Sequence, residues 1–159
     1  MKIRECMARL LLLVPMWGCL ASSDEPAAGD DRENASAIES DLAGTAFDTI
    51  TFTNNGAAAV TSSGVSFAGT VSPSPAATVG AGQSNTYVET GVGNVTSFHI
   101  DYSAGGKKCH FDSASFPNGA SCTFTKNALS QGSAFATCTA TLTAFDLQTC
   151  SQSVSFTMR

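Results

Sequence analysis

The chain has 159 residues, of which 43% are hydrophobic and 13% are charged, and its formal net charge at pH 7 is −5. A chain of this length suits one domain with a single core. The charge is unevenly distributed, because residues 20–43 hold seven acids and one base, whereas residues 44–159 hold five acids and four bases. A nearly neutral domain without a basic patch argues against binding to nucleic acid.

The first residues have the pattern of an export signal. Three basic residues lie within residues 1–9, and the apolar run 10–17 follows them. This run is too short to cross a bilayer, so the pattern predicts a cleaved leader rather than a membrane span.

The segment Met16–Cys19 (MWGC) then places a small residue, Gly18, directly before a cysteine. It resembles the lipobox of bacterial lipoproteins, and the resemblance implies that Cys19 is lipidated and becomes the mature N-terminus. The chain is then expected to be exported and anchored to a bacterial membrane. The alternative is ordinary cleavage after Ala21 or Ser23, which would give a secreted or periplasmic protein.

Three regions are expected from these changes in composition. Residues 1–21 form the signal peptide and lipobox, residues 22–44 form an acidic flexible linker, and residues 45–159 form a folded domain. The linker is rich in acids, Ala and Ser and has no strand periodicity, which is typical of a solvated segment.

From residue 45 onward, short alternating runs are separated by Gly, Pro and Asn turns. About eight strands with almost no helix-forming sequence predict an all-β fold, an antiparallel immunoglobulin-like β-sandwich, with a small β-barrel as the alternative. The segment Thr78–Thr90 also resembles the strand-turn-strand of bacterial immunoglobulin-like domains. The expected strand regions are 49–53, 65–67 with 71, the end of a strand and a second strand on either side of a glycine turn within 78–90, the hairpin 98–113, 122–124, 135–145 and 150–158.

Four of the six cysteines lie in the domain: Cys109, Cys122, Cys138 and Cys150. An even number in an exported chain predicts two disulfides, and three connectivities are possible. We favour Cys109 with Cys122 and Cys138 with Cys150, because each pair can face across a short hairpin. No CxxC spacing is present to indicate a structural zinc site.

The clearest hairpin is Phe98–Ser113, which turns at Gly105–Gly106, where a tight turn needs positive φ angles. Its alternation directs Phe98, Ile100, Tyr102, Cys109 and Phe111 inward. The other face then brings together His99, Asp101, His110 and Asp112. These side chains are either two exposed ion pairs or ligands for Zn²⁺ or Cu²⁺, which prefer nitrogen and oxygen donors of this kind. Lys107 and Lys108 beside the turn are interpreted as solubilising residues.

No catalytic residues are predicted. The run Gly64–Ala68 lacks the full GxSxG spacing and lies on a strand, and the only Glu of the domain, Glu89, has no evident carboxylate partner. We therefore expect a non-enzymatic protein with no cofactor, unless the His and Asp residues bind a metal ion.

The expected function is that of a binding or structural module of the cell envelope, whose partner is an unknown protein or glycan surface, with the membrane contacted through a lipid on Cys19. An alternative is a small secreted inhibitor or effector that presents a rigid loop. The candidate loop is Phe116, Pro117, Asn118 and Gly119, which a Cys109–Cys122 disulfide would restrain.

Overall fold

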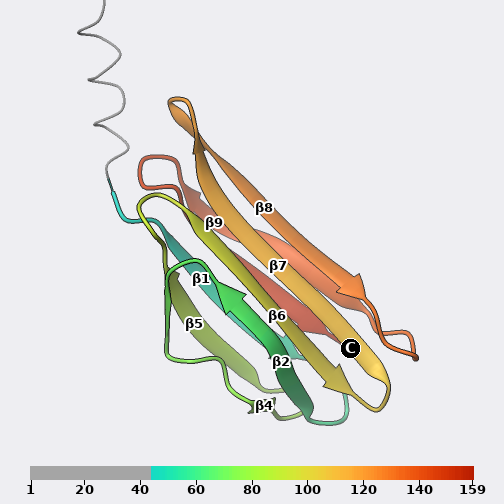
Figure 1. Cartoon of the computed structure of the whole chain (residues 1–159). Helices are drawn as coiled ribbons and strands as arrows, with labels where there is room; N and C mark the ends of the chain where they lie inside the picture. Colours follow the sequence, from blue (N-terminus) through green and yellow to red (C-terminus); the bar gives the residue numbers. More distant parts are fainter. Residues whose placement is uncertain (1–43) are drawn as a thin grey trace, which may run out of the picture. The chain divides into compact units, whose positions relative to one another are not determined.

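The structure is a computed structural model, and it describes residues 44–159 (Figure 1). The predicted signal peptide, the lipidation site Cys19 and nearly all of the linker lie outside the described residues. Within residues 44–159 there is no helix, and therefore no helix long and apolar enough to cross a membrane.

Ten strands form two five-stranded sheets that pack face to face. The strands are β1 Phe47–Asn54, β2 Val60–Phe67, β3 Thr70–Ser72, β4 Thr78–Val79, β5 Ser84–Thr90, β6 Thr96–Ala104, β7 Lys107–Asn118, β8 Ser121–Ser130, β9 Cys138–Asp146 and β10 Ser151–Met158.

The first sheet has the order β3-β5-β1-β10-β9 and the second has the order β4-β2-β6-β7-β8. The predicted β-sandwich is confirmed, and the barrel alternative is wrong because the two sheets stay separate. The strand number exceeds the predicted eight or so partly because the expected strand region 65–67 with 71 is divided into β2 and the three-residue β3. One pair, β1 with β10, is parallel, whereas every other pair is antiparallel.

The alternation in the sequence builds the core. On β1, Ile50 and Phe52 point between the sheets and are fully buried, whereas Thr49, Thr51 and Thr53 on the other face are partly exposed. Phe52 stacks on a ring from the opposite sheet, that of Tyr102, with 3.6 Å between ring centroids. Burying such side chains contributes roughly 1.5–3 kcal/mol each, so these rows hold the sheets together.

The predicted hairpin register is confirmed. Gly105 and Gly106 form the turn between β6 and β7 with φ angles of 56° and 82°, which non-glycine residues rarely adopt. The strands then pair Tyr102 with Cys109 and Asp101 with His110, as the alternation requires.

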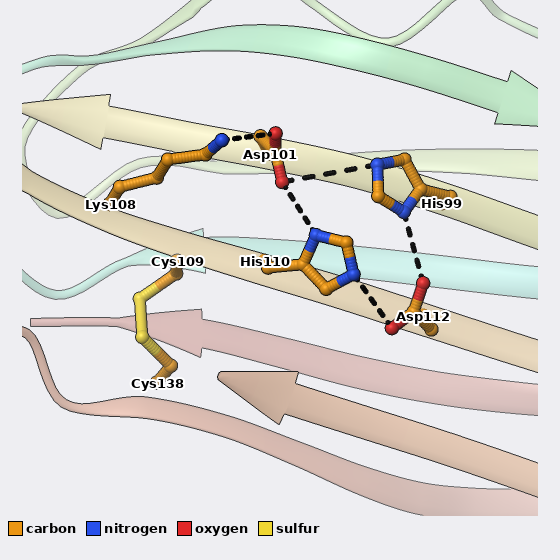
Figure 2. Close-up of polar contacts among 7 residues, drawn as sticks. All are labelled: His99, Asp101, Lys108, Cys109, His110, Asp112 and Cys138. Carbon is orange, nitrogen blue, oxygen red and sulfur yellow. Dashed lines mark hydrogen bonds and ion pairs between the residues drawn. A yellow bond between two sulfur atoms is a disulfide. The ribbon is translucent and has the colours of Figure 1, made fainter. Parts of the chain in front are cut away.

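The favoured disulfide pairing is wrong. The structure links Cys109 to Cys138 and Cys122 to Cys150, so each bond joins the two sheets instead of closing one hairpin. Cys109 on β7 faces Ser130 of β8. Cys122 lies eight residues away along that strand, or about 26 Å, which no disulfide can bridge. The Cys109–Cys138 bond, which joins β7 to β9, is drawn in Figure 2.

The expected loop around Phe116 is also wrong. Phe116, Pro117 and Asn118 are the last residues of β7 and pair with β8, and the turn begins at Gly119. Strand β6 starts opposite Ser115, so β7 has no neighbour on that side beyond this point. Proline is tolerated there because its missing N–H would have no partner in the sheet.

Candidate functional site

The His and Asp residues of the central hairpin form one cluster on the outer face of the second sheet. His99 and Asp101 lie on β6, and His110 and Asp112 lie opposite them on β7. Both strands are internal in their sheet, since β2 flanks β6 and β8 flanks β7. The sequence therefore predicted the cluster correctly, because a two-residue turn fixes the register and the period of two fixes the face. We call these four residues the His–Asp cluster.

The cluster is a closed ring of polar contacts (Figure 2). The Asp112 carboxylate lies between the two imidazoles, with Oδ1 3.0 Å from His99 Nδ1 and Oδ2 3.0 Å from His110 Nε2. The other nitrogen of His110, Nδ1, lies 2.9 Å from Asp101 Oδ1, and His99 Nε2 lies 3.9 Å from the same oxygen. The two rings stand edge to face, with centroids 4.3 Å apart.

Asp101 is the most buried member, with 7% of its surface exposed. Burial raises the pKa of Asp101, but hydrogen bonds from Lys108 and His110 and their positive charges outweigh this effect, so its pKa lies below the ordinary value. Lys108 Nζ lies 2.7 Å from Asp101 Oδ2. The interpretation of Lys108 as merely solubilising is incomplete, and its position two residues before His110 was the signal that it shares this face.

Strand β2 passes close beside the cluster. A bulge between Ser63 and Ser66 contains Gly64, whose φ of 59° is in the left-handed region. A methyl group on Gly64 would lie 3.1 Å from Asp101 Oδ2 and 3.6 Å from His99 Nε2. Glycine therefore lets the backbone pass close to the cluster without covering it, and both imidazoles stay partly exposed.

The sequence did not reveal a second polar group, which lies between the sheets. Asp48 on β1 is opposite Glu89 on β5, and both are fully buried. Burial raises the pKa of Asp48 to about 6, although hydrogen bonds from Ser113 and Gln152 act in the opposite direction. The carboxylate partner that Glu89 lacked in the sequence is therefore Asp48, but the pair is closed to solvent and cannot act on a substrate from outside.

The exposed large apolar side chains gather elsewhere. Seven of the ten lie at one end of the sandwich, where β1, β6, β8 and β10 begin and β2, β5, β7 and β9 end (upper left in Figure 1). We call this group the apolar end. Its members are Phe47, Phe67, Val92, Val95, Phe116, Phe145 and Leu147.

The apolar end differs from the opposite end in charge as well as in hydrophobicity. Among the described residues, Lys107, Lys108 and Arg159 lie at or near the opposite end, by the hairpin turn and the end of β10. The exposed charge at the apolar end is the carboxylate of Asp146. The fourth base of the described residues, Lys126, lies in the middle of β8, where it pairs with Ser113. A large exposed apolar surface is typical of a site that contacts a protein or a membrane.

Comparison with known proteins identifies the fold. No protein-family model matches the chain, and no curated sequence matches it. Among solved structures, it resembles the crystal structure of Nakanori, a lipid-binding protein, with a TM-score of 0.52 and 10% sequence identity. The match covers 80% of this chain and 77% of that chain. At this identity the similarity supports the β-sandwich fold alone.

Proposed function

We propose that this protein is a non-enzymatic binding module that is exported from the cell and contacts a lipid bilayer through its apolar end. The observation that carries the proposal is the concentration of seven exposed large apolar side chains at one end of the sandwich. The two disulfides support export, because such bonds persist in oxidising compartments. The lipid-binding protein with the similar fold makes a lipid surface the first choice of partner.

The position of the tether supports the same orientation. The described chain begins at Gly44, which lies beside Thr149 at the apolar end, whereas Arg159 ends the chain at the opposite end. If Cys19 carries a lipid, residues 20–43 connect it to the apolar end. The domain would therefore be attached to the membrane through the end that carries the exposed apolar side chains.

The composition of this end favours an electrically neutral bilayer. Of the basic side chains in the described residues, the one nearest this end is Lys126 in the middle of β8, and Asp146 is exposed at the end itself, so anionic lipids would gain little attraction. Binding would depend on apolar side chains such as Phe145 and Leu147, which are 59% and 48% exposed. Each buried side chain of this size contributes roughly 1.5–3 kcal/mol.

Co-sedimentation with phosphatidylcholine vesicles tests the proposal. The protein carries Cys19→Ser, so that no attached lipid contributes, and F145S/L147S is compared with F135S. Phe135 is the matched control because it is 81% exposed but lies in the loop before β9, at the opposite end. We expect F145S/L147S to weaken binding by at least about tenfold and F135S to leave it unchanged. Equal binding by the two variants, or no binding by the parent, would overturn the proposal.

The inhibitor alternative has lost its structural basis. It required Phe116 to lie on a loop closed by a Cys109–Cys122 disulfide, but Phe116 lies on β7 and that disulfide does not form.

The non-enzymatic part of the proposal is tested separately with the purified protein and a panel of hydrolase substrates. Turnover that disappears when one named residue is replaced would contradict it.

A further inference from the structure

We propose that His99, His110 and Asp112 form a binding site for a divalent transition metal that prefers imidazole ligands, Cu²⁺ or Zn²⁺, and that Asp101 positions His110 for it. One ligand atom from each of the three residues can be chosen so that all lie within 4.8 Å of one another. Two imidazole nitrogens and a carboxylate oxygen are a common donor set for both metals. The site belongs to the face of the second sheet and is independent of the apolar end.

The distances already approach those of a metal centre. Zinc binds nitrogen and oxygen ligands at about 2.0–2.2 Å, which places neighbouring donors of a tetrahedron roughly 3.3 Å apart. Asp112 Oδ1 lies 3.0 Å from His99 Nδ1 and Asp112 Oδ2 lies 3.0 Å from His110 Nε2, so an oxygen that serves as the single ligand atom already has the required spacing to one imidazole. The distance from that oxygen to the other imidazole shortens when the half-exposed carboxylate rotates. The third separation, between His99 and His110, closes by rotation of rings that are partly exposed (Figure 2).

Asp101 has a different role from the one that the sequence suggested. Its Oδ1 accepts a hydrogen bond from His110 Nδ1 at 2.9 Å when that nitrogen carries the proton. This bond leaves Nε2, the nitrogen that faces Asp112, available as the metal ligand. A carboxylate behind the metal-binding imidazole is the usual way in which proteins fix its tautomer and orientation. Lys108 in turn holds Asp101 through the 2.7 Å ion pair.

The alternative is that the cluster binds no metal and that its imidazoles and carboxylates are satisfied by hydrogen bonds to one another. The two accounts differ in what they require of Asp112. Without a metal, Asp112 only accepts hydrogen bonds from the imidazoles. Its side chain is 40% exposed, so that replacing it should have little effect on the protein. In a metal site it supplies one of three ligands, so that D112N should weaken metal binding strongly while leaving the fold intact.

The test is calorimetric titration of the full chain with CuCl₂ and with ZnCl₂. His99 and His110 are the only histidines of the chain, and Cys6 and Cys19 are replaced by serine so that free thiols do not compete. We expect a one-to-one complex with micromolar or tighter affinity. We expect the H99A/H110A variant to lose at least about 100-fold in affinity, and electron paramagnetic resonance of the Cu²⁺ complex to report two nitrogen ligands.

The positioning role of Asp101 has its own readout. We expect D101N to retain the metal but to bind it about 10–100-fold more weakly, as is typical when the partner behind a metal-binding histidine is lost. D146N, at an exposed acid outside the cluster, is the matched control and should bind as the parent does. Binding no tighter than millimolar by the parent, or equal binding by H99A/H110A, would overturn the metal site. Equal binding by D101N and D146N would overturn the role of Asp101.

Discussion

The buried carboxylate of Asp48 makes a specific prediction about stability and pH. Asp48 is fully buried between the sheets beside Glu89, and only its Oδ2 atom has hydrogen-bond donors, Ser113 and Gln152. Its other oxygen, Oδ1, has no hydrogen-bond partner among residues 44–159. A charge in this position is poorly compensated, and therefore the proton is held more tightly in the folded protein than in the unfolded chain.

The direction and size of the change in stability with pH follow from the pKa values of Asp48 in the folded and unfolded protein. Burial raises the folded pKa from 3.8 to about 6, so the folded protein binds more protons than the unfolded chain between these values. Stability is then fully present below about pH 4 and falls as the pH rises through 6. The difference of about two pKa units corresponds to a loss of roughly 3 kcal/mol.

The D48N variant should remove this loss. An amide keeps an acceptor for Ser113 and Gln152 but carries no charge, so we expect D48N to be more stable than the parent by about 1–3 kcal/mol at pH 7.5. At pH 4 the two proteins should differ little. The measurement is urea unfolding of both proteins at a series of pH values, compared through their free energies of unfolding.

D146N is the control for this experiment, because hydrogen bonds from Gln148 and Thr149 lower the pKa of exposed Asp146. The contribution of Asp146 to stability has the opposite pH dependence, since a carboxylate with a lowered pKa stabilises the fold at neutral pH and no longer does so in acid. We therefore expect D146N to lose stability at pH 7.5 and not in acid. A stability difference between D48N and the parent that stays constant from pH 4 to 7.5 would refute the account of Asp48.

Three further predictions concern the fold. Replacing Cys109 and Cys138 by serine should lower the free energy of unfolding, measured in urea, by roughly 3–4 kcal/mol, because the bond closes a chain segment with a sequence separation of 29. Peptide mapping without reduction should recover the Cys109–Cys138 pair. A disulfide-linked Cys109–Cys122 peptide would contradict the structure. G91A should destabilise by at least about 2 kcal/mol, because its new methyl group would overlap the backbone oxygen of Val95, whereas G80A should have a mild effect. Equal thermal shifts for the two variants would argue against this packing. F52A should cost about 3–5 kcal/mol, and a loss below 1 kcal/mol would mean that the Phe52 ring is not in the core.

The sequence predicted those features that depend on neighbouring residues. The turn at Gly105–Gly106 allows one register, and the alternation along β6 and β7 then decides which side chains point inward. For that reason the His–Asp cluster could be predicted to the residue. Its inner members, such as Ile100 and Phe111, are fully buried as expected.

The features that were missed depend on how distant strands meet. The disulfide pairing is decided by the contact between the two sheets, because Cys138 on β9 approaches Cys109 across the open side of the sandwich. The pairing of Asp48 with Glu89 requires β1 to lie beside β5, which no local pattern specifies. The apolar end likewise exists only because turns far apart in the sequence meet at one end of the sheets.

The apolar end and the His–Asp cluster are far enough apart to bind their ligands independently. Asp112 lies four residues before Phe116 on the same face of β7, so the His–Asp cluster stands about 13 Å from this edge of the apolar end. Phe67 lies nearer, because it pairs with Phe98 beside His99, but the alternation along the strands directs it to the opposite face of the sheet. A bilayer that takes up Phe145 and Leu147 would therefore leave the cluster in water. We expect F145S/L147S to bind Cu²⁺ as the parent does, and H99A/H110A to bind phosphatidylcholine vesicles as the parent does. If either variant changed the other activity by more than about threefold, or 0.7 kcal/mol, the two surfaces would be coupled, and the separation argued from β7 would be wrong.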